Sequence, residues 1–212
     1  MIVSLNEIES LTLKACRGVG MSWGLAEEAA QAARWLASHG VAWDRSLVML
    51  LSHHIETAPP VRTGRSIVSS QAGAPLCPIH AGTAIADLLD AEDSWTVNDV
   101  LQPVWLVPLI HSRRNTQSQL ILRTPEDALT LVADQLVESL HGLSQINRIA
   151  RIRIELGPPD ADPIDARVPM SAPFPVDVGA WGKLEGYAAS TYVPASLQSR
   201  ISGAGAGVSD ND

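Results

Sequence analysis

Apolar residues in positions 1–57 recur at the intervals of three and four residues that place side chains on one face of a helix. Ser4 followed by Glu7 has the spacing of a capping box, which predicts that a first helix starts at Ser4. The apolar residues that would form its buried face are Ile8, Leu11 and Ala15. Gly18 and Gly20 predict that this helix ends beside them.

Two more helices are expected before position 57. Ser22 is the expected cap of the second helix, which would end at Gly40, and Asp44 is the expected cap of a third that runs to about Ile55. The apolar stripe of the second helix is rich in alanine: Leu25, Ala29, Ala32, Ala33 and Leu36. Because such side chains are small, the stripe predicts a close approach between helices.

The central part of the chain mixes loop, strand and helix patterns. Residues 58–78 are rich in proline and glycine and are expected to be a loop. Pro108, inside an otherwise apolar run, favours an edge strand or a bulge. The expected strands are 104–110, 120–123 and the alternating segment 148–156, and a short helix is expected over 82–90.

A further helix is expected over residues 124–140. Thr124 can cap it, Pro125 suits its first position, and two acidic residues follow in the first turn. Its apolar side would be formed by Leu129, Val132, Leu136 and Val137.

The C-terminal part is expected to hold an irregular connection, two helices and a glycine-rich acidic tail. The connection covers 157–175, the helices cover 178–192 and 194–201, and the tail covers 203–212. The first of these helices would contain Trp181, Leu184 and Tyr187.

This order of elements favours an α+β fold over a regular doubly wound sheet. The prediction is one domain over residues 1–212, with an N-terminal helical section (1–57), a central mixed sheet with helices (76–156), and C-terminal helices with an ordered glycine-rich tail (176–212).

The charge balance narrows the expected partners. With a net charge of −8 the chain has no excess of cations to neutralise phosphates, which argues against nucleic acid and against an anionic membrane surface. Small molecules and other proteins remain as the expected binding partners. Almost all of the positive charge is arginine, because Lys14 and Lys183 are the only lysines.

The two cysteines, Cys16 and Cys77, are too few for a disulfide scaffold, and the chain does not open with a leader-like segment. A cytoplasmic location with reduced thiols is the natural expectation. The longest apolar runs are too short to cross a bilayer.

Three local motifs suggest chemistry, but their spacing favours structural roles. The turn 18–24 (GVGMSWG) follows a helix and places its third glycine one position late for a dinucleotide fingerprint. His53 and His54 are adjacent, so on a helix they cannot face one metal ion. Cys77 and His80 lie three apart, whereas catalytic Cys–His pairs are usually distant in sequence. No cofactor or metal site is predicted; a metal centre built from distant residues and a Cys–His pair stay open as alternatives.

The segment 191–212 is the most distinctive part of the chain. Hydroxyl groups, Arg200 and three alternate glycines precede an acidic end. We expect the tail to be ordered and docked, although a glycine-rich terminus is by default disordered.

Several strings resemble a bacterial family catalogued as a domain of unknown function, family 3726. They are 7–9 (EIE), 14–15 (KA), 17–18 (RG), 22–28 (SWGLAEE) and 33–36 (ARWL), together with 191–196 (TYVPAS), 199–200 (SR) and the tail. The resemblance implies no activity, substrate or catalytic residue.

The leading hypothesis is a cytoplasmic enzyme or enzyme subunit that acts on a small anionic metabolite. Arginine and hydroxyl groups would orient a carboxylate against a tryptophan wall, and no general base can be named. The candidate ligand-binding residues are Arg17, Trp23, Arg34, Tyr192, Ser196, Arg200, Gly203, Gly205, Gly207 and Asp210. The alternative is a non-catalytic ligand-binding or protein-interaction partner, whose tail docks on its own fold or on a neighbouring subunit. A homo-oligomer is a possible form of the protein.

Overall fold

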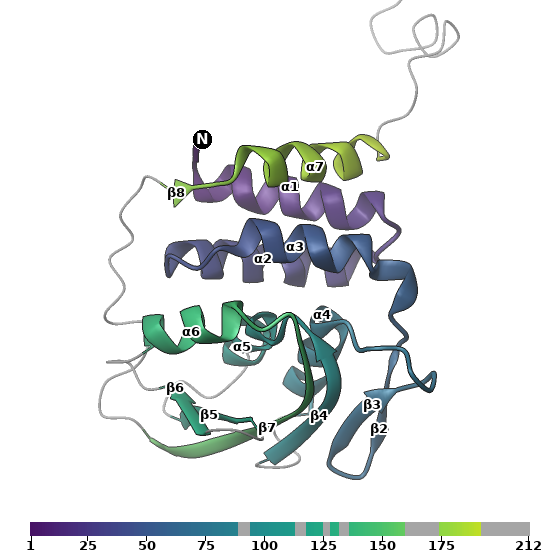
Figure 1. The fold of residues 1–212 in the computed structure, drawn as a ribbon, viewed down its shortest axis with the longest axis vertical. Helices are drawn as coiled ribbons and strands as arrows, with labels where there is room; N and C mark the ends of the chain where they lie inside the picture. The colour runs from purple at the N-terminus through teal and green to yellow at the C-terminus, as the bar shows by residue number, and fades with distance from the viewer. Residues whose placement is uncertain (89–93, 113–117, 125–127, 132–135, 160–173, 192–212) are drawn as a thin grey trace, which may run out of the picture.

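A computed structural model describes residues 1–88, 94–112, 118–124, 128–131, 136–159 and 174–191. Figure 1 shows a layered molecule in which helices lie on one side of a curved sheet. The long helices are α1 (Leu5–Gly18), α2 (Trp23–Ser38), α3 (Trp43–Ser52) and α7 (Val178–Ala189), and the shorter α4 (Pro78–Ala86), α5 (Leu106–His111) and α6 (Leu136–Ser144) lie between them and the sheet. The predicted α+β class is confirmed.

The main sheet has six described strands in the order β2-β3-β4-β7-β5-β6. Strands β3 and β4 are parallel, and the other neighbours are antiparallel, so the sheet is mixed. The strands are β2 (Pro60–Thr63), β3 (Ser66–Ser69), β4 (Ser94–Leu101), β5 (Ser118–Arg123), β6 (Ala128–Leu131) and β7 (Arg148–Pro159). A separate antiparallel pair joins β1 (Ile2–Val3), at the start of the chain, to β8 (Phe174–Pro175), which precedes α7.

The first two helices form as the sequence predicts. The Ser4 backbone and side chain both donate to the Glu7 carboxylate at 2.7 Å, and the Glu7 backbone N–H donates to the Ser4 hydroxyl, so the capping box is present. Four of the five stripe residues of α2 are buried: Ala29, Ala32, Ala33 and Leu36. The predicted helices α1 and α2 are confirmed.

Helix α7 packs on α1 at very close range. A Cβ atom added to Gly18 would lie 1.8 Å from the Tyr187 carbonyl oxygen, so only glycine permits this approach. The helix predicted over 178–192 is confirmed as α7, which ends at Ala189 and whose Trp181 and Leu184 side chains are buried.

Asp44 was expected to cap α3, but the helix begins at Trp43 after Ala42. The Asp44 carboxylate instead accepts the backbone N–H of Asp177 at 2.6 Å and that of Arg45 at 2.8 Å. A tertiary contact therefore replaces the expected cap, because the buried Asp44 carboxylate accepts hydrogen bonds from backbone N–H groups, one of them at the start of α7.

Two segments predicted as loop or helix form strands. Within 58–78, β2 and β3 make a hairpin around Gly64, whose φ is 60°, so the turn residues mark only the bend between two short strands. Within 124–140, β6 pairs with β5, and a helix begins only at Leu136. Cross-strand pairing there overrides the local helix-start pattern.

Residues 104–110 were expected to be a strand and are helical. A 3₁₀ turn, η3 (Pro103–Trp105), leads into α5, and every residue from Val104 to Ile110 is buried. A continuous apolar run has no periodicity to distinguish a buried helix from a buried strand. Pro108 is tolerated because it lies in the first turn of α5, where the backbone N–H has no helical partner. Helix α4 likewise starts at Pro78, four residues before the predicted Gly82.

Buried apolar side chains of the helices and of the sheet form one core that extends from Val3 to Leu184. In the part of the chain that is described, no helix has the length and apolar character needed to cross a membrane. The expected helix over 194–201 and the tail over 203–212 lie outside the described residues.

Candidate functional site

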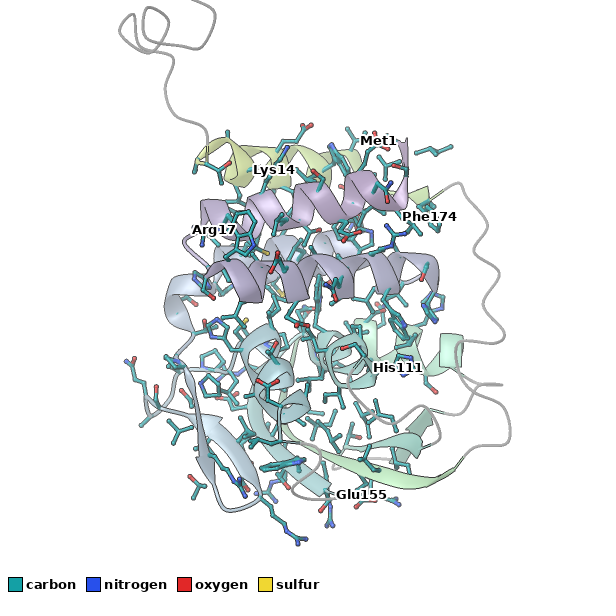
Figure 2. The ribbon with its side chains drawn as sticks, turned by 180° about the vertical axis from the view of Figure 1, so that it is seen from behind. Met1, Lys14, Arg17, His111, Glu155 and Phe174 are labelled. Carbon is teal, nitrogen blue, oxygen red and sulfur yellow. The ribbon has the colours of Figure 1, made fainter. Side chains whose placement is uncertain are left out.

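Two of the predicted site residues come together at one end of the helical layer. The Arg17 guanidinium carbon lies 5.8 Å from the centroid of the Trp23 ring, within the range of a cation–π contact, and Arg17 also donates to the Met21 carbonyl. Trp23 is 59% exposed, so its ring forms an open surface and not the wall of a pocket. Figure 2 shows Arg17 at the end of α1 that Gly18 holds against α7.

Arg34 does not join this pair. It lies 11 residues after Trp23 on α2, which is about 16 Å along a helix. Its guanidinium contacts the Glu9 carboxylate at 3.0 Å and the Asn6 side chain at 2.7 Å, so it ties α2 to α1. The remaining predicted site residues, Tyr192, Ser196, Arg200, Gly203, Gly205, Gly207 and Asp210, lie outside the described residues.

The groove between α3 and α7 has the composition of a binding site. Its volume is about 560 Å³, within the range of small-ligand pockets. It is lined by Arg45, Val48, Met49, Ser52, His53, Asp177, Gly179, Ala180 and Lys183. Three of these side chains are basic and one is acidic, while Val48 and Met49 supply an apolar floor.

Asp177 sets the geometry of this groove. One of its carboxylate oxygens accepts from the Ala180 backbone N–H at 2.8 Å and caps α7, and the other contacts the Arg45 guanidinium at 2.7 Å. The hydrogen bond from Arg45, followed by that from Ala180, lowers the pKa of Asp177. The contact holds the Arg45 side chain, which is 75% exposed, at the mouth of the groove.

His53 and Lys183 complete the basic side of the α3–α7 groove. The His53 Nδ1 atom lies 2.9 Å from the Met49 carbonyl oxygen, and its Nε2 atom lies 3.9 Å from the Glu56 carboxylate. Lys183 comes from the exposed side of α7. Sequence reasoning missed this site because Arg45 and Asp177 are 132 positions apart. The one local signal was the scarcity of lysine: both Lys14 and Lys183 line grooves beside α7.

The groove on the other side of α7, between α1 and α7, is less suited to an anion. It has a volume of about 510 Å³ and contains Glu7, Lys14 and Glu185. Trp181 donates from its indole N–H to Glu185 at 3.1 Å, and Glu7 belongs to the capping box. Two carboxylates against one amine would repel a negatively charged ligand.

The Cys77–His80 alternative is not supported by the geometry. Burial raises the pKa of Cys77 and raises the pKa of Cys16 to about 12, which disfavours the thiolate form of both at neutral pH. The His80 ring faces His54 at a centroid distance of 6.3 Å. Among the described residues, no group of three or more histidine, cysteine or acidic side chains is placed to hold a metal ion.

Comparison with known proteins agrees with the N-terminal part of the resemblance. No curated protein matches the chain. One region of the chain matches a family model; it runs from Val3 of β1 to the β2–β3 turn and includes Arg17, Trp23, Arg45 and His53. Residues 3–65 match the family described as "Protein of unknown function (DUF3726)", which is the family that the N-terminal strings of the sequence resemble.

Proposed function

We propose that this protein binds a small anionic metabolite in the groove between α3 and α7. The observation that carries the proposal is that Arg45, His53 and Lys183 line one groove with a single carboxylate, Asp177. In a chain with a net charge of −8, an arginine and one of the two lysines line this groove. A carboxylate or phosphate group is the ligand chemistry that these side chains recognise.

Each side chain has a distinct role in the proposed binding. Asp177 holds the Arg45 guanidinium, so less side-chain entropy is lost when Arg45 binds an anion. Lys183 supplies a mobile point charge, and the His53 ring lines the same groove. Val48 and Met49 would contact the apolar part of the ligand.

The proposal is one of binding, because the serine–histidine contact in this groove is directed at a backbone carbonyl. The Ser52 hydroxyl lies 3.1 Å from the His53 Nδ1 atom, but it donates to the Met49 carbonyl at 2.8 Å, and the same Nδ1 atom lies 2.9 Å from that carbonyl oxygen. The Asp177 carboxylate caps α7. An enzyme subunit that supplies the binding half of a shared site is compatible with this arrangement.

A thermal-shift screen tests the proposal. Wild-type protein is screened with di- and tricarboxylates and with phosphate esters, and at least one is expected to raise the melting temperature. Lys183→Gln should weaken its binding about tenfold, as expected for a lost charge-assisted hydrogen bond. Lys14→Gln, in the neighbouring groove, is the matched control and should bind normally. The proposal fails if no anion stabilises the protein, or if Lys183→Gln and Lys14→Gln respond alike.

One observation favours protein binding as a second candidate function. In the Arg17–Trp23 pair the tryptophan is exposed and the arginine half-buried, and both are residue types enriched in the centres of protein interfaces. Sedimentation of wild-type and Trp23→Ala protein at several concentrations tests for self-association. An identical distribution of species in both would argue against a self-interface at Trp23.

A further inference from the structure

The open face of the six-stranded sheet carries a row of arginines. In β7 the side chains alternate, with Ile152 and Ile154 buried toward the helices and Arg151 and Arg153 exposed on the opposite face. Arg123 of β5 pairs directly with Arg153, so it shares that face. In Figure 1 the described helices lie on the other side of the sheet, and Figure 2 shows Glu155 on the side that points away from them.

Glu155 shows how this row holds a carboxylate. Its two oxygens contact the Nε atom of Arg123 at 2.9 Å and the Nε atom of Arg153 at 2.8 Å. Two arginines directly opposite each other on neighbouring strands repel. The Glu155 carboxylate between them offsets that repulsion, so a negative group is part of the stable arrangement.

Arg151 lacks an equivalent partner. Within the described chain it forms no ion pair, and the residue opposite it on β4 is Asn98, whose amide can both donate and accept. It lies two residues from Arg153 on the same face, a separation of about 6.6 Å along a strand. Among the described residues, Arg151 is therefore the arginine of this row that has a polar neighbour but no carboxylate partner.

We propose that the open face, formed by Arg123, Arg151, Arg153, Thr96, Asn98 and the apolar pair Val61 and Val68, binds an acidic segment of a partner polypeptide. Arg151 would take a carboxylate of that segment as Arg123 and Arg153 take Glu155. Among the described residues, the face bears three arginines against one carboxylate, in a chain whose net charge is −8. Charge complementarity therefore selects this face for a negatively charged partner.

A polypeptide fits this face better than nucleic acid. The net charge of the whole chain opposes a long polyanion. The described residues of the face include no aromatic side chain on which bases could stack, since the Trp95 ring is buried on the helix side. Val61, which is 45% exposed and pairs with Val68 at the β2 edge, offers contact to an apolar side chain of a peptide.

Fluorescence anisotropy with the full chain tests the inference. The probe is a labelled twelve-residue peptide of alternating Glu and Ser, and its control replaces every Glu by Gln. The acidic peptide should bind and the neutral peptide should not, and Arg151→Glu should weaken binding about tenfold or more. Lys14→Glu makes the same charge change on the helical layer and should bind as wild type does. Circular dichroism of both variants verifies that they fold.

Three results would overturn the inference. One is equal binding of the acidic and neutral peptides, and another is an unchanged affinity in Arg151→Glu. The third is tighter binding of a single-stranded oligonucleotide than of the acidic peptide, which would identify the face as a nucleic-acid site. Because Arg151 lies in the sheet and Lys183 on α7, Arg151→Glu should leave the thermal shift by a groove-binding anion unchanged, so the two proposals fail separately.

Discussion

Gly18 is the residue at which the N-terminal and C-terminal helices come closest. The backbone of Tyr187 occupies the space that a side chain at position 18 would need. The contact fixes α7 along α1, and α7 in turn carries Lys183 and the Asp177 cap to the α3–α7 groove. A single absent methyl group thus bears on both the packing of the helical layer and the proposed site.

Replacing Gly18 by alanine should destabilise the protein by about 1–3 kcal/mol, as overpacking does, because α1 and α7 must separate. Urea denaturation followed by circular dichroism measures the change. Gly186→Ala is the control: it lies on α7 with no atom within 4 Å of a new Cβ, so it should be neutral or stabilise by about 0.5–1 kcal/mol. Equal stability of the two variants would contradict the close packing.

Asp44 is a second residue that stabilises a contact between distant parts of the chain, because its carboxylate accepts the backbone N–H of Asp177. Asp44→Ala removes the acceptor of two backbone N–H groups and should cost about 1–3 kcal/mol in the free energy of unfolding. The exposed Asp87, which follows α4, serves as the control, and Asp87→Ala should stay within about 0.5 kcal/mol of wild type. A loss for Asp44→Ala no greater than that of the control would show that the contact to α7 contributes nothing.

At the scale of elements, the contact between η1 (His54–Glu56) and the first turn of α4 makes stability depend on pH. Burial lowers the pKa of His54, and burial together with the charge of His54 lowers the pKa of His80, from an ordinary value of 6.5. The unfolded chain therefore binds more protons than the native state below pH 6.5, so this contribution is complete above that pH and falls as the pH decreases.

The melting temperature should accordingly fall between pH 7.5 and pH 5, and the double variant His54→Gln, His80→Gln should lose less over the same range. Differential scanning fluorimetry at matched ionic strength measures both. A fall of equal size in the two proteins would rule out these histidines as its cause.

Elements with a strong period were predictable from the sequence, and those without one were not. The capping box at Ser4 and the alternation around Ile152 led to α1 and β7 because each pattern matches one backbone geometry. Strand β4 escaped prediction because its alternation breaks at Asp99, a residue with a φ of 54° whose carboxylate pairs with Arg148. The apolar segment before His111 was assigned wrongly because it carries no period.

The candidate site was less predictable for a physical reason. Arg17 and Trp23 are close in sequence and do meet, but Arg34 is held by Glu9 of another helix. The α3–α7 groove joins residues from two distant helices, and no local motif encodes that contact. The residues that line the groove can be identified only when the packing of α7 against α3 is known.

At the scale of the whole molecule, two places in the described part of an acidic chain carry basic side chains that are proposed to bind a ligand. One is the α3–α7 groove with Arg45 and Lys183, and the other is the open sheet face with Arg151 and Arg153. The helical layer and the sheet would thus present separate sites, one for a small anion and one for an acidic polypeptide. Arg45→Gln should weaken small-anion binding about tenfold and leave the affinity for an acidic peptide unchanged.

The measurement that tests the central claim most directly is a titration of ¹⁵N-labelled protein with the anion that gives the largest thermal shift, followed by two-dimensional NMR. Binding in the α3–α7 groove predicts that the backbone amide resonances of His53, Gly179 and Lys183 shift together and give one dissociation constant. The Lys183→Gln substitution should raise that dissociation constant. Shifts confined to Arg17 and Trp23, or to the strands of the sheet, would contradict the account.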